Sequence, residues 1–308
     1  MMIKKVIIKT LLVLIVFSSM SSIPLFNYKN SKNATIINYQ FPCLSLKEWK
    51  SYELASIGSG SNSFYPEITM NNLGDIYVTW NEGNSHIHVN VWNATTEEWS
   101  VPTTISIGSP AYSVCPDISS DNFNNIHVVW TDCTEDYYGS GPDEDIFYRC
   151  WNYTLKQWTD IEVVSTESTS DSSCSYLDID GNGNVHVVWE DYTNYGGSGS
   201  YESIFYKIRN SSNGLWTTTE VVSALGSYDS YLPDIAVDES GNAYVAWEQW
   251  TGTGTIILYR SRNANTKSWS SIFTITGSTS SIYVPDITID NDLNVYLAYA
   301  GWADSQRN

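Results

Sequence analysis

The segment PDIAVDESGNAYVAW, residues 233–247, is one of five copies of a fifteen-residue pattern. The other copies occupy residues 66–80, 116–130, 175–189 and 285–299. Their closing aromatic residues lie 50, 59, 58 and 52 residues apart, a spacing typical of repeats in which each unit is one supersecondary element stacked on its neighbours. The sequence therefore predicts a repeat protein, and it says more about architecture than about function.

Each unit reads as a β-hairpin followed by two further strands. Ile235 and Val237 share one side of an alternating run, which breaks at a Gly or Asn turn and resumes as a second alternating run, the pattern of an antiparallel hairpin. A third apolar and aromatic run follows, and a fourth starts at a second Trp, for example 204–208 and 216–223. Four short antiparallel strands describe a propeller blade. We therefore expect an all-β fold, a β-propeller of four-stranded antiparallel blades.

The strand count predicts an incomplete ring. Residues 49–56 match the fourth run of the later units, and the fifth unit stops at Asn308 after its second strand. The chain thus holds four complete blades plus parts of a fifth, about nineteen strands against the 20 or 24 of a ring with five or six blades. The segment 49–56 is placed to pair with the last blade. We expect five or six blades in the full protein, with this chain a fragment of it or residues 301–308 leading into further sequence.

The first residues read as an export signal. Lysines at positions 4, 5 and 9 precede an apolar run, 11–17, and small residues at 19–21 suit a signal peptidase. We expect a signal peptide at 1–22, with an uncleaved N-terminal anchor as the alternative, then a linker at 23–45 and the propeller at 46–308. Sequons at Asn33, Asn93, Asn152 and Asn210 fit a secreted or cell-surface protein.

The charge balance limits the partners. The chain has 15 Lys and Arg against 34 Asp and Glu, a net charge of −19, which argues against nucleic acid and anionic membrane surfaces. A glycan or a protein surface remains, with no membrane insertion beyond the possible N-terminal anchor. The 13 Trp and 22 Tyr agree with an all-β extracellular protein.

Five cysteines, at positions 43, 115, 133, 150 and 174, are too few and too irregularly spaced for a disulfide scaffold and include no C-x-x-C pair for zinc. In a hairpin that turns near Phe123, Cys115 falls opposite 131–133, so we expect a Cys115–Cys133 disulfide. A Cys133–Cys174 bridge between neighbouring blades is the alternative. In an oxidising compartment either bridge is favoured over a reactive thiol.

The units resemble those of the sialidase-like propellers, the bacterial neuraminidase repeat group, over about 49–308. In that family the turn between the third and fourth strands carries an Asp-box, Ser-x-Asp-x-Gly-x-Thr-Trp. Residues 261–269, SRNANTKSW, keep the Ser, an Asn in place of the Asp, and the Trp, with one extra residue. The copies at 92–99, 151–158 and 209–216 keep the Asn and the Trp. The resemblance implies a propeller, and an Asp-box implies a structural turn rather than catalysis.

The resemblance also implies what sialidase chemistry would need: three arginines converging on the ring axis, a Tyr/Glu pair and an acidic residue. Here Arg149 and Arg260 share one repeat position with Lys207, while Arg209 and Arg262 lie together at the ends of third strands. Residues repeated from blade to blade are better explained by packing than by one central site. With no arginine triad or other catalytic motif, we expect a non-catalytic member, although the sequence leaves an enzyme open.

Two patterns that resemble metal sites read as structure. His127 and His186 stand where tyrosines stand in the other units, which indicates packing aromatics. Residues 178–184, DIDGNGN, imitate the first half of a calcium loop, but the twelfth position is Trp189 rather than a bidentate acid. The same segment aligns with the other hairpin turns. We expect no metal and no cofactor, with calcium in the acidic loops as the alternative.

The loops after the second strands mark a candidate ligand face, because in propellers they share a face with the blade-to-blade connections. They are rich in Asp, Glu, Tyr and Gly at 131–145, 190–203 and 248–255. Tyr and Trp offer flat apolar surface, and carboxylates accept hydrogen bonds from hydroxyls, which suits a glycan or a protein surface. The candidate ligand-binding residues are Asp132, Asp136, Tyr137, Tyr138, Glu190, Asp191, Tyr192, Glu248 and Trp250.

Three functions remain. We expect mainly a secreted or cell-surface, non-catalytic binding module for a glycan or a protein partner. One alternative is a glycan-cleaving propeller, a sialidase-like hydrolase or polysaccharide lyase; the other is a structural repeat domain of a larger surface protein. A cleft with a carboxylate of raised pKa near Tyr or Arg would favour the enzyme, and aromatic pockets at equivalent blade positions would favour a lectin-like module. The enzyme's acid, base or tyrosine would lie among Asp132, Asp136, Tyr137, Tyr138, Glu190, Asp191 and Tyr192.

Overall fold

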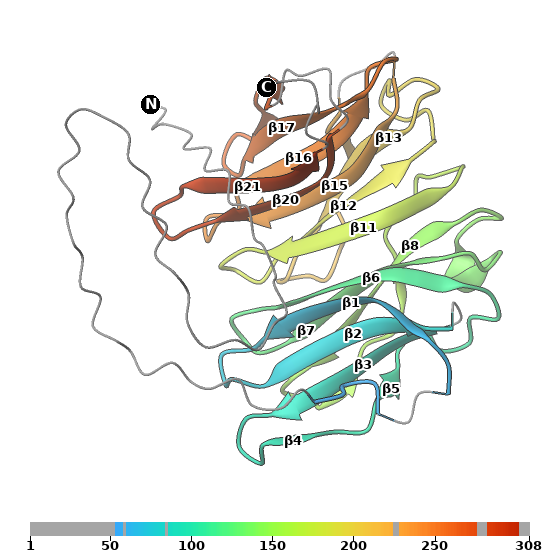
Figure 1. Ribbon diagram of the computed structural model, residues 1–308, viewed down its shortest axis with the longest axis vertical. Helices are drawn as coiled ribbons and strands as arrows, with labels where there is room; N and C mark the ends of the chain where they lie inside the picture. The colour runs from blue at the N-terminus through green and yellow to red at the C-terminus, as the bar shows by residue number, and fades with distance from the viewer. Residues whose placement is uncertain (1–52, 58–59, 84–85, 224–227, 276–281, 302–308) are drawn as a thin grey trace, which may run out of the picture. The chain divides into compact units, whose positions relative to one another are not determined.

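The computed structural model describes residues 53–57, 60–83, 86–223, 228–275 and 282–301. These residues form antiparallel sheets that follow one another along the chain, with one short 3-10 turn, η1 (Tyr137–Gly139) (Figure 1). The predicted all-β class is confirmed, and the sheets are the four-stranded antiparallel blades of a β-propeller.

The strands repeat in the same order from blade to blade. Blade 1 contains β1 (Ser63–Met70), β2 (Ile76–Glu82), β3 (His86–Asn93), β4 (Glu98–Trp99) and β5 (Thr103–Thr104). Blade 2 contains β6 (Ser113–Ser120), β7 (Ile126–Asp132), β8 (Asp145–Asn152), β9 (Gln157–Trp158) and β10 (Glu162–Val163). Blade 3 contains β11 (Ser172–Ile179), β12 (Val185–Asp191), β13 (Ser203–Arg209) and β14 (Glu220–Val221). Blade 4 contains β15 (Ser230–Val237), β16 (Ala243–Trp250), β17 (Thr255–Asn263), β18 (Ser268–Trp269) and β19 (Phe273–Thr274), and a fifth hairpin contains β20 (Ile282–Ile289) and β21 (Val295–Gly301).

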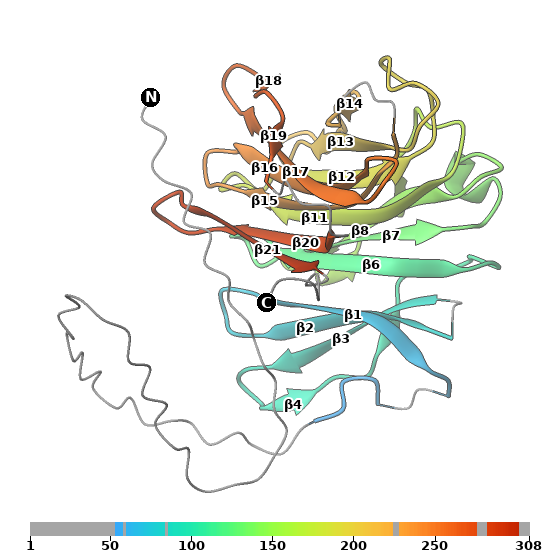
Figure 2. The same cartoon turned by 45° about the horizontal axis from the view of Figure 1, so that its top comes forward.

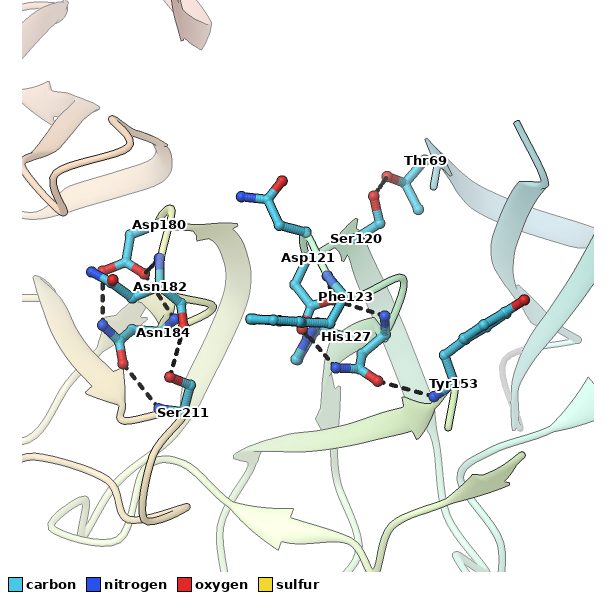
Figure 3. Close-up of polar contacts among 12 residues, drawn as sticks. Thr69, Ser120, Asp121, Phe123, His127, Tyr153, Asp180, Asn182, Asn184 and Ser211 are labelled. Atoms are coloured by element: carbon cyan, nitrogen blue, oxygen red, sulfur yellow. Dashed lines mark hydrogen bonds and ion pairs between the residues drawn. The ribbon is translucent and has the colours of Figure 1, made fainter. Parts of the chain in front are cut away.

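The hairpin turns are built by an Asp side chain that binds the turn's own N–H groups. In blade 3 the carboxylate of Asp180 accepts hydrogen bonds from the amides of Asn182 and Asn184, at 2.9 and 2.8 Å, and from the Asn184 side chain at 2.8 Å (Figure 3). Gly183 supplies the left-handed conformation that closes the turn, with φ of 79°. The interpretation of 178–184 as a turn is confirmed.

The inner strands carry the links between blades. β1, β6, β11, β15 and β20 lie side by side in chain order (Figure 1). Three aspartates on these strands each accept a hydrogen bond of 2.6 or 2.7 Å from a main-chain amide of the next blade. Because each bond joins two neighbouring blades, these side chains fix the register of one blade on the next. The pairs are Asp117 with Leu177, Asp178 with Val237, and Asp234 with Ile287.

The closing tryptophans form the centre of each blade. Trp130, Trp189 and Trp247 are at most 1% exposed and pack with the apolar sides of the neighbouring strands. Their aromatic counterpart in the fifth hairpin, Tyr299, is 39% exposed. The fifteen-residue pattern therefore records the core of a blade.

The fourth strand is shorter than predicted. It consists of pairs of residues such as β9 and β10, and Figure 2 shows the corresponding β14, β18 and β19 on the outer side of their blades. A hydroxyl next to the second Trp interrupts the ladder, because Thr159 Oγ1 and Thr217 Oγ1 accept the hydrogen bonds of the third-strand amides Cys150 and Ile208, at 3.0 and 3.1 Å. A side chain thus takes the place of a main-chain partner.

Residue Ala55 stands where the outer strand of a preceding blade would lie. Its carbonyl accepts a hydrogen bond of 2.8 Å from the Asn90 side chain on β3. Arg149 on β8 donates the corresponding bond to Ile105 at 2.9 Å, and Ile105 lies six residues after Trp99 as Ala55 lies six after Trp49. This contact agrees with the predicted match of 49–56 to a fourth strand.

The predicted signal peptide, anchor and linker, at 1–22 and 23–45, lie outside the described residues, as do Cys43 and residues 302–308. Within the described ranges, no helix has both the length and the apolar character needed to cross a membrane.

Candidate functional site

The loop face is defined here by the loops 133–144, 192–202 and 251–254, which follow the second strands, and by the connections 105–112 and 164–171 between blades. Loops of neighbouring blades contact one another on this face. The amide of Glu202, for example, donates a hydrogen bond of 3.0 Å to Asp229 at the start of the next blade.

Asp132 and Asp191 are structural residues rather than exposed ligand-binding residues, which corrects their predicted role. Both are fully buried. The Asp191 carboxylate accepts hydrogen bonds from the Ser172 hydroxyl at 2.8 Å and the Trp189 indole at 3.0 Å, and the Asp132 carboxylate accepts one from Ser113 at 2.7 Å. These bonds tie the end of the second strand to the first strand.

The remaining predicted residues divide by exposure. Tyr137 is buried and donates its hydroxyl hydrogen bond to the Ile107 carbonyl at 2.5 Å, and buried Glu248 accepts a hydrogen bond of 2.5 Å from the Val284 amide. Neither side chain faces solvent, so a direct ligand contact does not fit them. The exposed candidates are Asp136, Tyr138, Tyr192 and Trp250.

Blade 3 places two carboxyl groups together beneath the loop face. Glu190, at the end of β12, and Glu202, just before β13, are 6% and 4% exposed, and their side chains are hydrogen-bonded to each other. Glu190 also accepts a hydrogen bond from the Leu232 amide of blade 4. The pair therefore lies at the junction of two blades.

Burial raises the pKa of both carboxyl groups. The pKa of Glu190 rises to about 8, first through loss of solvent and then through the nearby Cys174. The pKa of Glu202 rises to about 8, first through loss of solvent and then through Glu190. Two buried acids in contact cannot both ionise cheaply, so the pair retains a proton at neutral pH.

Two tyrosines connect this pair to the surface. Tyr192, 47% exposed, lies beside Glu202, and this carboxyl group raises the pKa of the phenol. Loss of solvent and a bond of 3.1 Å to Asp229 raise the pKa of Tyr231 to about 12. A proton-bearing carboxyl group is thus linked to an exposed phenol.

Glu190 and Tyr192 were predictable from the sequence pattern, whereas Glu202, Asp229 and Tyr231 were not predicted from it. Glu202 stands in the same acidic loop, and the equivalent Glu144 precedes β8 in blade 2. The recurrence of a Glu directly before the third strand could therefore have predicted Glu202. The contact between Glu202 and Asp229 could not be predicted in this way, because the two residues belong to different blades.

The expected Cys115–Cys133 disulfide is absent, since Cys115, Cys133, Cys150 and Cys174 are free thiols. The Cys133 thiol lies 3.2 Å from Glu144. Cys115 instead lies beside Cys174 of the neighbouring blade. Both residues have positive φ, 49° and 48°, at the bulge of their inner strands, and this bulge turns Cys115 away from its hairpin partner.

The repeated basic residues hold neighbouring blades together, as the sequence interpretation proposed. Arg149 and Arg260 each donate to a main-chain carbonyl of the preceding blade, and the Lys207 ammonium does the same at 2.8 Å. Arg209 pairs with Glu162 of the preceding blade. None of these cations is free to form a central site.

The histidines are packing residues, as predicted. His127 is 4% exposed, and its ring lies 2.7 Å from the Tyr148 hydroxyl. The ring also lies 3.3 Å from Asp121 (Figure 3). His186 makes the corresponding contact with Tyr206 at 2.6 Å. Within the ranges that the structure describes, no three His, Cys, Asp or Glu side chains are grouped to hold a metal ion.

Two hollows lie between the outer strands of neighbouring blades. One of about 590 Å³ includes Tyr195, Glu220, Arg260 and Trp269 in its lining. The other, of about 120 Å³, includes Trp151 and Trp158. Both place the second Trp of one blade beside the outer strand of the preceding blade.

No family model matches the chain, and no curated protein matches it. Solved structures of the same fold do. A PL25 ulvan lyase is 12% identical with a TM-score of 0.57, over 77% of this chain and 62% of that one. The polysaccharide lyase Uly1 is 13% identical with a TM-score of 0.52, over 81% and 57%. A protein of unknown function from Dyadobacter fermentans is 12% identical with a TM-score of 0.57, over 78% and 76%.

At these identities the likeness establishes the fold alone. The chain spans only about three fifths of the two lyase structures.

Proposed function

We propose that this protein is a secreted or cell-surface, non-catalytic β-propeller that binds a glycan on the loop face of blade 3. The observation that carries the proposal is the exposed Tyr192 phenol beside buried Glu202. Tyr201 and Tyr228, each 42% exposed, directly precede Glu202 and Asp229 in the chain. Exposed phenol rings beside hydrogen-bonding carboxyl groups suit the apolar faces and hydroxyls of a sugar.

The charges favour a neutral glycan. The Lys and Arg side chains that the structure describes on third strands are committed to contacts between blades, and Lys156 and Lys267 lie in turns at the other end of the blades. A related ulvan lyase has the acidic unit GlcA(1-4)Rha3S bound. Such a ligand would meet carboxyl groups on this loop face without a described cation to neutralise it.

The test is a binding screen of the full chain against neutral and acidic glycans. We expect selective binding of neutral glycans, weakened about five- to thirtyfold by Tyr192→Ala, because loss of an aromatic contact removes on the order of 1–2 kcal/mol. Tyr138→Ala, in the exposed loop of blade 2, is the matched control and should bind as wild type. Absence of binding by the folded chain, or equal losses in both variants, would overturn the proposal.

Glycan cleavage is the second candidate, and the raised pKa of Glu202 favours it. A carboxyl group that keeps its proton at neutral pH can act as a general acid, and Glu202 lies beside the exposed Tyr192. Product release from the bound glycan would be measured for wild type and Glu202→Gln. Turnover that the variant abolishes, with binding retained, would replace the non-catalytic proposal by this one.

A further inference from the structure

The junctions between blades 2 and 3 and between blades 3 and 4 are closed by the same three groups. In the first, Arg209 donates two hydrogen bonds of 2.8 Å to Glu162, and the Trp216 indole donates a third, also of 2.8 Å. The second uses Arg262, Glu220 and Trp269 in the same arrangement. The outer part of each junction is thus fastened by an ion pair and an indole N–H.

A tyrosine fills the space beneath each of these ion pairs. Tyr148 and Tyr206 are fully buried. The Tyr148 ring packs edge-on against Trp216 at 5.4 Å, and the Arg209 guanidinium lies 5.1 Å from its centroid. Removing such a ring would leave a hollow lined by the second Trp.

The junction between blades 1 and 2 differs at all of these positions except that of the indole. By strand register, Val89 replaces the tyrosine, Thr103 replaces the glutamate and Trp151 replaces the arginine. These three residues line the hollow of about 120 Å³ together with Trp158 and Tyr77. The junction between blades 3 and 4, which keeps the ion pair and the tyrosine, also borders a hollow, but the lining of that hollow includes Glu220 and Arg260. The three replacements therefore give the smaller hollow a lining without charged side chains.

The hollow offers aromatic faces and neutral hydrogen-bonding groups. Trp151 and Trp158 stand edge to face, with centroids 5.8 Å apart. Within the described residues, the Trp158 indole N–H and the Thr103 hydroxyl have no hydrogen-bond partner, whereas the equivalent indoles bind glutamates. Ser100 lines the same hollow, and no Asp, Glu, Lys or Arg is among its lining residues.

We propose that this hollow binds one neutral sugar ring, as a second glycan site independent of the loop face. An indole ring would pack on the apolar C–H face of the sugar, and the Trp158 N–H and the Thr103 hydroxyl would bind its hydroxyls. The small volume limits the ligand to a single ring, and the neutral lining selects against acidic sugars. Neither argument uses the loop-face residues. An experiment can therefore reject this site without rejecting the proposed function, and the reverse.

The experiment converts this junction into the type found between blades 3 and 4. Free glucose, galactose, mannose, fucose and N-acetylglucosamine would be titrated against the full chain, followed by ligand-observed saturation-transfer NMR and tryptophan fluorescence. We expect at least one sugar to bind in the millimolar range, as for single-ring ligands of small sites. Thr103→Glu/Trp151→Arg, which rebuilds the ion pair, should fold as wild type and weaken binding at least about tenfold.

Two further variants separate this site from the other one. Trp158→Phe keeps an aromatic face but removes the N–H, and should weaken binding severalfold. Tyr192→Ala should leave it unchanged. The proposal is overturned if no sugar binds the folded wild type, if Thr103→Glu/Trp151→Arg binds the sugar equally well, or if Tyr192→Ala removes this binding.

Discussion

Arg209 in blade 3 and Glu162 in blade 2 form a two-point ion pair, with both N–O distances at 2.8 Å. The side chains are 18% and 26% exposed, so solvent only partly screens the pair. The guanidinium also lies 5.1 Å from the centroid of the Tyr148 ring. One side chain therefore fastens the outer edge of two blades that are joined at their inner strands by Asp117 and Leu177.

Replacing this arginine should weaken the junction. We expect Arg209→Ala to lower the free energy of unfolding by about 1–2 kcal/mol, discounted for partial exposure. Arg209→Lys should recover part of the loss, because an ammonium keeps the charge but not the two-point geometry. Chemical denaturation measures both. Equal stability of Arg209→Ala and wild type would show that the pair contributes nothing.

Removing the Asp191 carboxylate should damage the fold rather than a ligand site. The change leaves the Ser172 hydroxyl and the Trp189 indole without partners inside the protein. We expect Asp191→Ala to lower the free energy of unfolding by roughly 3–5 kcal/mol. Exposed Tyr192→Ala next to it should change stability by no more than about 0.5 kcal/mol. Thermal and denaturant unfolding of the two variants test this contrast, which fails if both are equally stable.

The carboxyl pair of blade 3 should make stability depend on pH. The pKa of Glu202 and that of Glu190 are each about 8 in the folded protein against an ordinary 4.5. Between these values the folded state binds more protons than the unfolded state, so the free energy of unfolding falls as pH rises from about 4.5 to 8. Below this pH window the stabilisation from the protons held by the two carboxyl groups is fully present, and above the window it is lost.

Glu202→Gln isolates this effect, because it removes one titrating group and keeps the shape. The free energy of unfolding of the variant minus that of wild type should therefore be larger at about pH 9 than at about pH 5. Denaturant unfolding over the pH series provides the measurement. A constant difference between variant and wild type across the series would contradict the raised pKa of Glu202.

The turn of the fifth hairpin offers a stabilising change. Leu293 has φ of 62°, at the position where Gly183 and Gly241 stand in blades 3 and 4. A leucine pays a steric cost in this conformation and a glycine does not. Because Leu293 is also 57% exposed, we expect Leu293→Gly to raise the free energy of unfolding by about 0.5–1 kcal/mol. Leu155→Gly, at another exposed turn leucine, should show no gain.

The candidate site in blade 3 could be predicted from the sequence only in part. The repeat pattern predicted the position of the loop face, with Glu190 and Tyr192 on it. Asp132 and Asp191 were also predicted there, because acidic residues in variable loops often bind ligands. In the structure both carboxylates are buried, and Asp191 is bound by side chains of a different strand, such as Ser172. Composition of a loop does not reveal which of its acids point inward.

The sequence by itself determined the strands, their alternation and their turns, because these depend on residues a few positions apart. The Asp180 turn and the buried Trp189 are legible from one unit alone. Only the tertiary structure decided which side chains meet across strands and blades: Glu202 against Glu190 within blade 3, and Trp158 against the outer strand of blade 1. Such contacts join residues from different strands or blades, so they depend on how complete blades pack and not on any local pattern.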